Sequence, residues 1–312
     1  MIKVLFVSSG NSNNGISPIV KSQGESLKSN GVDIHYFNIR GKGFKGYLSN
    51  IKLIKASQKE IQPDLIHAHY SLTAILSSLA GAKPLIVSLM GSDVKTKLWF
   101  RLVLWFFYKF YWKKTIVKSA EMKLLLKFKH VHIIPNGVDT SKFKPLCKYE
   151  CQDKLNWESN KIHILFPADP SRYVKNFGLA KKSVDRLKKN YIIELHTLTD
   201  VSHNKIPVYI NAADVILLSS LWEGSPNVIK ESMACNRPIV ATNVGDVQWL
   251  FGNSEGHYLT SFEEEDVVKK IGKAIEFSKK NGETQGKKRI IELNLDSNST
   301  SRKIIEIYKD IK

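Results

Sequence analysis

The chain has 312 residues, a length that suggests two globular domains and excludes a disulfide-stapled miniprotein or a lone small binding module. Hydrophobic residues make up 43% of the chain and charged residues 24%, a balance that allows buried cores and excludes intrinsic disorder. The formal net charge of +18 predicts attraction to phosphorylated small molecules, anionic lipid or nucleic acid, without choosing among them.

The three cysteines, Cys147, Cys151 and Cys235, are an odd number, so we expect no disulfide framework and a reducing, cytoplasmic setting. Three residues separate Cys147 from Cys151, and no second pair of cysteines or histidines follows at the spacing of a metal site. A metal site at these cysteines is therefore disfavoured. The apolar run at residues 1–7 is too short for a signal peptide and predicts a buried first strand.

Apolar runs of strand length alternate with helical patterns in two series along the chain. This alternation is typical of parallel strands with covering helices. The expected strands are residues 3–8, 32–38, 65–68, 85–89, 115–117 and 132–134, then 162–167, 192–197, 215–219, 238–242 and 257–259. We therefore expect an α/β protein with two doubly wound parallel sheets.

The segment 97–114, KLWFRLVLWFFYKFYWKK, combines aromatic and aliphatic side chains with basic ones. It is not expected to span a bilayer, because Arg101 and Lys109 interrupt it and a spanning helix needs about 20 apolar residues. Two interpretations stay open. The segment is either a mostly buried helix of an α/β domain or an interfacial helix on an anionic membrane, with its tryptophan rings at headgroup depth.

The polar stretch 148–160 has little periodicity, and we interpret it as the linker between two domains. Near the end of the chain, a predicted helix carries an apolar stripe that needs a partner surface. The stripe consists of Ile304, Ile307, Tyr308 and Ile311. The expected organisation is a domain at 1–146, a domain at 147–296, and a terminal helix at 297–312 that returns to the first domain.

Ligands of open parallel sheets bind beyond the carboxyl ends of the strands, so the loops that follow strands are the candidate sites. The first such loop contains Asn14 and Gly15 and leads to Ser17 and Pro18, which suit the N-cap and first position of a helix. A glycine-containing loop of this kind suits an anion, although a plain strand-to-helix turn explains it equally well. The loop lacks G-x-G-x-x-G, which argues against a nicotinamide enzyme.

The most informative local pattern is WEGSPNVIKE at residues 222–231. Ser225 and Pro226 are typical of the N-cap and first turn of a helix, whose backbone N–H groups and positive dipole end favour an anion. Glu223 and Glu231 bracket this terminus. The pattern indicates an anion site flanked by two carboxylates, with surface glutamates on a structural helix as the alternative.

In its wider context, the stretch 214–245 resembles the E-x7-E region of retaining GT-B glycosyltransferases of the large family four. Further matches to that family are IPNGVD at 134–139 with Phe143 and Pro145, PDLIHAH at 63–69, and GSD at 91–93. These motifs occur in the family's order over essentially the whole chain, and their combination is specific.

The resemblance implies two Rossmann-like domains with a cleft between them, the second binding a nucleotide sugar and the first binding the acceptor. By position, Glu231 would accept hydrogen bonds from ribose hydroxyls and Glu223 would contact the donor sugar. A carboxylate suits a vicinal diol, and a helix terminus suits a diphosphate. The implied donor-binding set also includes Ser225, Pro226, Asn227, Val228, Gly15 and Asn14.

A departing nucleoside diphosphate gains negative charge, so cations aimed at it stabilise the transition state. Relatives place an arginine and a lysine after the first strand of the second domain. Lys175 matches the lysine, whereas Pro170 occupies the arginine position and Arg172 lies two residues later. The candidate catalytic residues are therefore Glu223, Lys175, Arg172 and His69.

On the acceptor side, many relatives have a histidine before the glycine that is Gly91 here, where this chain has Met90. His69, Gly91 and Asp93 are the remaining candidates, although a strand-end histidine is equally often structural. The resemblance implies a front-face reaction in which the donor phosphate helps to deprotonate the acceptor. Because the sequence has no D-x-D triplet, we expect neither a metal nor another cofactor.

The implied function is transfer of a hexosyl residue from a UDP- or GDP-sugar to a saccharide or lipid-linked acceptor in cell-surface polysaccharide synthesis. We expect a cytoplasmic protein, with an anionic membrane surface on the inner face as a partner of segment 97–114. The alternatives are a GT-B nucleotide-sugar epimerase and a catalytically lapsed nucleotide-sugar binder. No nucleic-acid partner is expected, because no recognised motif occurs and the lysines are scattered.

Overall fold

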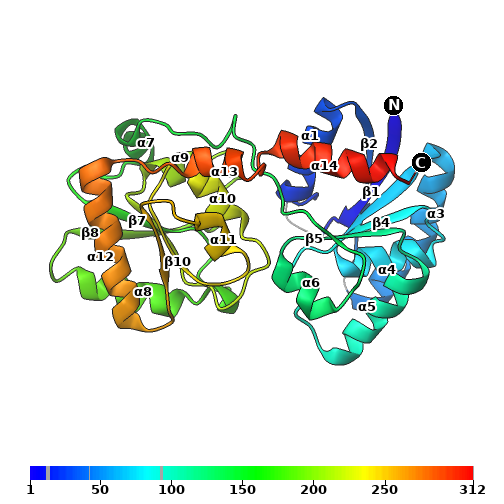
Figure 1. The fold of residues 1–312 in the computed structure, drawn as a ribbon, viewed down its shortest axis with the longest axis horizontal. Helices are drawn as coiled ribbons and strands as arrows, with labels where there is room; N and C mark the ends of the chain where they lie inside the picture. Colours follow the sequence, from blue (N-terminus) through cyan, green and yellow to red (C-terminus); the bar gives the residue numbers. More distant parts are fainter. Residues whose placement is uncertain (12–14, 42, 92–93, 312) are drawn as a thin grey trace. The chain divides into compact units, whose positions relative to one another are not determined.

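The computed structural model describes residues 1–11, 15–41, 43–91 and 94–311. The chain forms two compact units, the first comprising Met1–Gly137 with Ser297–Lys312 and the second Val138–Asp296. In each unit, helices cover a parallel sheet (Figure 1). The expectation of an α/β protein with two doubly wound parallel sheets is confirmed.

The first sheet has six parallel strands in the order β2-β1-β3-β4-β5-β6. They are β1 (Ile2–Ser9), β2 (Val32–Ile39), β3 (Leu65–His69), β4 (Leu85–Ser88), β5 (Lys114–Val117) and β6 (His132–Ile133). The helices of this unit are α1 (Pro18–Ser29), α2 (Gly43–Leu48), α3 (Asn50–Ile61), α4 (Ser71–Leu79), α5 (Leu98–Phe110), α6 (Ala120–Leu126) and α14 (Ser297–Lys309).

Two apolar layers enclose this first sheet. Helices α3, α4, α5 and α6 pack on one face, and α1 and α14 pack on the other. The central strands read as nearly continuous apolar runs because both of their faces are buried.

The terminal helix α14 packs against α1 and buries the apolar stripe seen in the sequence. Ile304 and Tyr308 are fully buried, and the hydroxyl of Tyr308 lies 2.6 Å from Nδ1 of His67 on β3. Burial raises the pKa of Tyr308 well above its ordinary value, so its hydroxyl keeps its proton. The last helix of the chain thus completes the core of the first unit.

The second sheet has five parallel strands in the order β11-β10-β9-β7-β8. They are β7 (Ile162–Phe166), β8 (Ile193–Thr197), β9 (Val215–Leu218), β10 (Ile239–Thr242) and β11 (His257–Thr260). Its helices are α7 (Lys148–Leu155), the 3-10 turn η1 (Tyr173–Lys175), α8 (Phe177–Leu187), α9 (Ile206–Ala212), α10 (Asn227–Ala234), α11 (Val247–Phe251), α12 (Glu264–Asn281) and α13 (Gly286–Glu292). Helices α8 and α12 cover one face, whereas α9, α10, α11 and α13 cover the other.

The structure differs from the sequence interpretation between the two sheets. The compact units divide after Gly137, ahead of the expected boundary at 146, because Val138 and Phe143 are buried in the core of the second unit. The stretch interpreted as a linker begins with helix α7, so that interpretation was wrong for residues 148–155. The side-chain amide of Gln152 donates to the carbonyl of Ala212 at 3.0 Å and ties α7 to α9.

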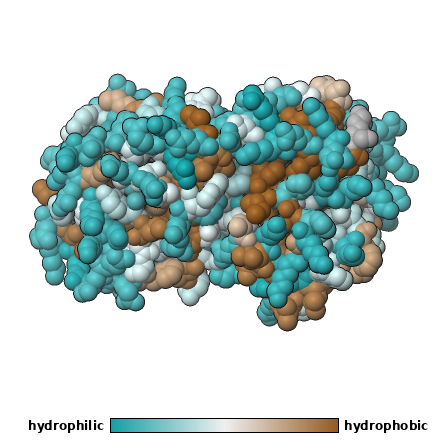
Figure 2. Space-filling model, viewed as in Figure 1, coloured by the Kyte–Doolittle hydropathy of each residue, from teal (hydrophilic) through white to brown (hydrophobic). Residues whose placement is uncertain are grey.

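Helix α5 corresponds to the aromatic and basic segment of the sequence. Only Leu104 and Phe107 are buried, whereas Trp99 and Phe110 are 62% and 63% exposed, so the interpretation of a mostly buried helix was wrong. Figure 2 shows apolar surface in the region of α5 at the lower edge of the first unit. Among the described residues, no helix combines the length and apolar character needed to cross a membrane.

Candidate active site

Three neighbouring strands of the second sheet, β8, β7 and β9, end at the same edge because they run parallel. The loop after β7 carries Lys175, the loop after β8 carries His203, and the segment after β9 carries Glu223 and leads into α10 with Glu231. Residues far apart in the sequence therefore meet at the carboxyl edge of one sheet.

Lys175 and Glu223 form the central contact of this edge. The ammonium of Lys175 donates to Oε1 of Glu223 at 2.5 Å, and both side chains are largely buried. Ser220 Oγ donates to the same carboxylate oxygen at 2.8 Å. The buried carboxylate thus keeps a paired cation and a hydroxyl donor, as burial of a charge requires.

The backbone around this ion pair is closely supported. Ser219 Oγ donates to the carbonyls of Lys175 and Asn176 at 3.1 and 2.9 Å, which joins the β7 loop to the β9 loop. Gly245 has φ +60°, and a Cβ at this position would lie 2.7 Å from the carbonyl oxygen of Gly224. A larger residue at 245 would displace the segment that carries Glu223.

Arg172 is not part of this contact. It is the N-cap of the turn η1, and its side chain is exposed, whereas Lys175 at the end of the same turn is buried. The structure therefore places the two basic candidates of this loop in different environments.

Helix α10 begins at Asn227, with Pro226 as its N-cap. The expectation that Ser225 is the N-cap was wrong by one residue. Ser225 Oγ instead lies 3.0 Å from the ammonium of Lys230, which donates to it from one turn into the helix. The N–H groups of the first turn, which begins with Asn227 and Val228, point out of the helix end beside Glu223.

Lys230 is a buried cation beneath this helix terminus. Its side chain is fully buried, and burial lowers its pKa to about 8, while the carboxylates of Asp246 and Glu231 act in the opposite direction. The ammonium adds positive charge below the N-terminus of α10, where the helix dipole is already positive.

Glu231 lies next to two residues that the sequence did not single out. Its Oε1 lies 3.5 Å from Nε2 of His203, and Nδ1 of His203 lies 2.6 Å from the ammonium of Lys142. Burial lowers the pKa of Lys142, and Glu231 opposes that shift. His203 and Lys142 both lie in loops that follow strands, and this position was the signal that could have identified them. Neither residue belongs to a motif.

The remaining candidates belong to the first unit. His69 is buried at the end of β3, neither of its ring nitrogens has a hydrogen-bond partner among the described residues, and its ring stacks on His67 at 4.3 Å. Burial, with the nearby charge of Lys118, lowers the pKa of His69 to about 3. Gly15 and Gly91 have φ values of +75° and +125°.

Two of the expected site residues cannot be placed. Asn14, expected on the donor side, and Asp93, expected on the acceptor side, lie outside the described residues.

Comparisons with known proteins extend this description. A family model described as "Glycosyl transferases group 1" matches residues 176–276, and one described as "Glycosyl transferase 4-like" matches residues 16–121. An Escherichia coli protein named UDP-Gal:alpha-D-GlcNAc-diphosphoundecaprenol alpha-1,3-galactosyltransferase is 25% identical, over 72% of this chain and 68% of its own length. The Bacillus subtilis glycosyltransferase TuaC, whose name assigns it to teichuronic acid biosynthesis, is 26% identical over 64% of this chain and 58% of its own length.

A solved structure with the same fold is that of Anabaena Alr3699/HepE in complex with UDP and glucose. It superposes with a TM-score of 0.76, at 16% identity, over 99% of this chain and all of that one. Both family models and both curated relatives concern glycosyltransferases. Each family model matches a stretch of one unit, and together with the relatives and the shared fold they identify the chain as a glycosyltransferase with the GT-B fold.

Proposed function

We propose that the chain transfers a hexosyl residue, with retention of anomeric configuration, from a UDP-sugar to a saccharide on a lipid diphosphate. UDP is favoured over GDP because the E. coli relative is named for UDP-galactose and the HepE structure holds UDP. The lipid-linked acceptor is favoured by the name of the E. coli relative, which includes diphosphoundecaprenol. The role in polysaccharide synthesis is favoured by the name of TuaC, which assigns it to teichuronic acid biosynthesis.

The observation that carries this proposal is the contact between Lys175 and Glu223 beside the N-terminus of α10. An ammonium has three donor hydrogens, and Glu223 engages one of them, so others are available for a phosphate oxygen. The first-turn N–H groups of α10 and the buried charge of Lys230 favour the same anion. The arrangement suits a diphosphate whose negative charge grows as the sugar departs.

The two carboxylates suit the uncharged parts of the donor. Glu231 is in the second turn of α10 and would accept hydrogen bonds from the ribose hydroxyls, with His203 beside it. Glu223 would accept from hydroxyls of the transferred sugar while it holds Lys175 in place. His69, Gly91 and Asp93 remain candidates for the acceptor side.

Helix α5 supports a peripheral site at an anionic membrane, where a lipid-linked acceptor resides. Its exposed side includes Trp99, Leu102, Phe106 and Phe110, which are spaced along one side of the helix. Arg101 and Lys109 on the same helix add positive charge. Aromatic rings at headgroup depth and basic side chains near anionic lipid both favour such binding.

The test is a thermal-shift comparison of the full chain with UDP, GDP, dTDP and CDP. A ligand at 100 times its dissociation constant stabilises the folded state by about 2.7 kcal/mol. We expect UDP alone to raise the melting temperature clearly, and Glu231→Gln and Lys175→Met to reduce the shift. Glu255→Gln, which removes an exposed carboxylate of the same unit, is the matched control. If no diphosphate stabilises the wild type, the donor assignment is wrong.

A further inference from the structure

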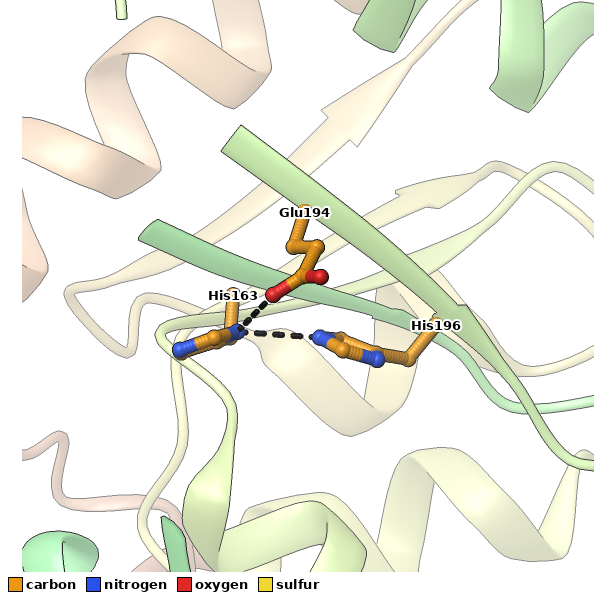
Figure 3. Close-up of side chains that lie close together, drawn as sticks. All are labelled: His163, Glu194 and His196. Atoms are coloured by element: carbon orange, nitrogen blue, oxygen red, sulfur yellow. Dashed lines mark hydrogen bonds and ion pairs between the residues drawn. The ribbon is translucent and has the colours of Figure 1, made fainter. Parts of the chain in front are cut away.

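Two imidazoles and a carboxylate meet on the second sheet, away from the residues assigned to the donor. His163 is on β7, and Glu194 and His196 are on the edge strand β8. The strand register pairs His163 with Glu194 and Leu165 with His196, so the three side chains share one face of the sheet. Figure 3 shows them pointing toward one another, and one ligand atom of each lies within 4.8 Å of the other two.

The ring of His163 is oriented as a metal ligand would be. Its Nε2 lies 2.9 Å from the carbonyl oxygen of Glu158, which can only accept, so Nε2 carries the proton of the neutral ring. The lone pair of Nδ1 then faces the cluster, 2.9 Å from Nε2 of His196 and 3.7 Å from Oε2 of Glu194. Metal-binding histidines commonly donate their other ring N–H to a backbone carbonyl in this way.

Trp157 holds the two rings in place. Its ring stacks on His196 at 3.5 Å and lies 4.9 Å from His163, both measured between ring centroids. His163 is fully buried, whereas the side chain of Glu194 is 46% exposed and leaves a route for an ion from solvent.

We propose that His163, His196 and Glu194 bind a divalent transition-metal ion of the Zn²⁺ class. Two imidazole nitrogens and one carboxylate oxygen form a donor set that Zn²⁺ accepts in four-coordinate sites, with water as the fourth ligand. The ion takes the place of the proton that His196 Nε2 shares with Nδ1 of His163, and that proton moves to Nδ1 of His196, so the ring stays neutral. Zn–N bonds of about 2.0–2.1 Å imply ligand nitrogens about 3.3 Å apart, so the rings separate by about 0.4 Å.

An ion bound by these three side chains would lie between strands β7 and β8. β8 is an edge strand held to the sheet by β7 alone, and the ion would cross-link these two strands through side chains. Its role is structural, and it takes no part in sugar transfer. The ammonium of Lys161 lies 4.0 Å from Oε2 of Glu194 and competes with the ion for that carboxylate.

The test uses the full-length chain after chelator treatment, titrated with Zn²⁺ against a chromophoric chelator and separately with Co²⁺. We expect one equivalent of Zn²⁺ to bind, the melting temperature to rise, and Co²⁺ to give the visible absorption of a four-coordinate site. His196→Asn and Glu194→Gln should each weaken Zn²⁺ binding more than tenfold. Lys161→Met should tighten it, because the competing ammonium is removed.

His130→Asn is the matched control, since it removes an exposed imidazole from the other unit and should leave Zn²⁺ affinity unchanged. Glu194→Gln keeps the test valid if His196→Asn does not fold, because Glu194 is half-exposed. The proposal is overturned if the wild type binds no stoichiometric Zn²⁺, or if Glu194→Gln binds it as tightly as the wild type does.

Discussion

His203 Nε2 lies 3.5 Å from Oε1 of Glu231, while its Nδ1 faces the ammonium of Lys142 at 2.6 Å. An ammonium can only donate, so Nδ1 accepts and the ring's single proton sits on Nε2, the nitrogen nearer to Glu231. Lys142 thus fixes the tautomer of His203, and His203 directs a donor toward the carboxylate proposed for the ribose. The three residues come from segments that no local pattern connects.

Replacement of Glu231 should therefore weaken UDP binding more than replacement of His203 does. Glu231→Gln should raise the dissociation constant of UDP about tenfold or more, because a hydrogen bond to a charged group contributes about 1.5–3 kcal/mol. His203→Ala should raise it by a smaller factor, because the histidine would act through Glu231. Isothermal titration calorimetry measures both. An unchanged dissociation constant for Glu231→Gln would remove the ribose assignment.

Lys175 should matter more for turnover than for binding of the donor. Lys175→Met should lower kcat about 100-fold or more, since one well-placed charge or donor on a developing anion commonly contributes that much. Its effect on the dissociation constant of UDP-sugar should be smaller. Steady-state kinetics and calorimetry separate the two. Lys181→Met, which removes an exposed lysine of α8, is the control and should leave kcat unchanged.

The sequence predicted the sheets well because burial on both faces leaves continuous apolar runs. All eleven expected strands occur within one residue of their expected ends. Helix α7 was missed because it buries only Cys151 and Gln152 and so carries no amphipathic pattern. Its stability comes from contacts with α9, which a local pattern does not reveal.

The candidate site was predictable only where a motif marks it. Glu223, Glu231 and Lys175 were recognised from spacing and resemblance, and the structure places Lys175 against Glu223. Lys230 lies within the same motif, yet its burial depends on how α10 packs and is invisible in the sequence. The role of Ser225 was also not predictable from the local pattern, which indicated an N-cap, whereas the structure places its hydroxyl against Lys230.

The first unit should lose stability in mild acid because of its buried histidines. The pKa of His69 is lowered from 6.5 to about 3, and that of His67 is lowered in the same direction. Between these pH values, the unfolded chain binds protons that the folded chain excludes, so stability falls as pH drops below about 6.5. Each group contributes up to about 1.4 kcal/mol per pH unit.

Urea unfolding between pH 4 and 7 measures this dependence. His69→Phe keeps a ring beside Phe6 and His67 and should flatten the pH dependence, whereas the exposed His130→Asn should not. Equal slopes for His69→Phe and the wild type would mean that His69 is protonated in the folded chain.

Helix α5 should bind anionic vesicles through its exposed aromatic side. Trp99→Ser and Phe110→Ser should each reduce sedimentation with vesicles of anionic lipid, because each removes a large exposed apolar side chain. Salt should weaken binding of the wild type, because Arg101 and Lys109 contribute through charge. Trp249→Ser removes an exposed tryptophan of the second unit and is the control. Binding that is equal for all variants and at all salt concentrations would exclude α5 as the membrane contact.

Lys230 should give the second unit an unusual stability profile at alkaline pH. Its folded pKa of about 8 lies below its ordinary value of 10.5, so between these values the unfolded chain holds a proton that the folded chain has lost. Stability from this group therefore rises with pH across that window, by on the order of 1 kcal/mol per pH unit.

Lys230→Met should abolish this rise in urea unfolding at pH 8–10, and Lys181→Met, at an exposed lysine, should preserve it. The same variant should weaken UDP binding at pH 7, because it removes a positive charge below the α10 terminus. A parallel rise in Lys230→Met and wild type would show that Lys230 keeps its proton throughout and is a fixed cation of the site.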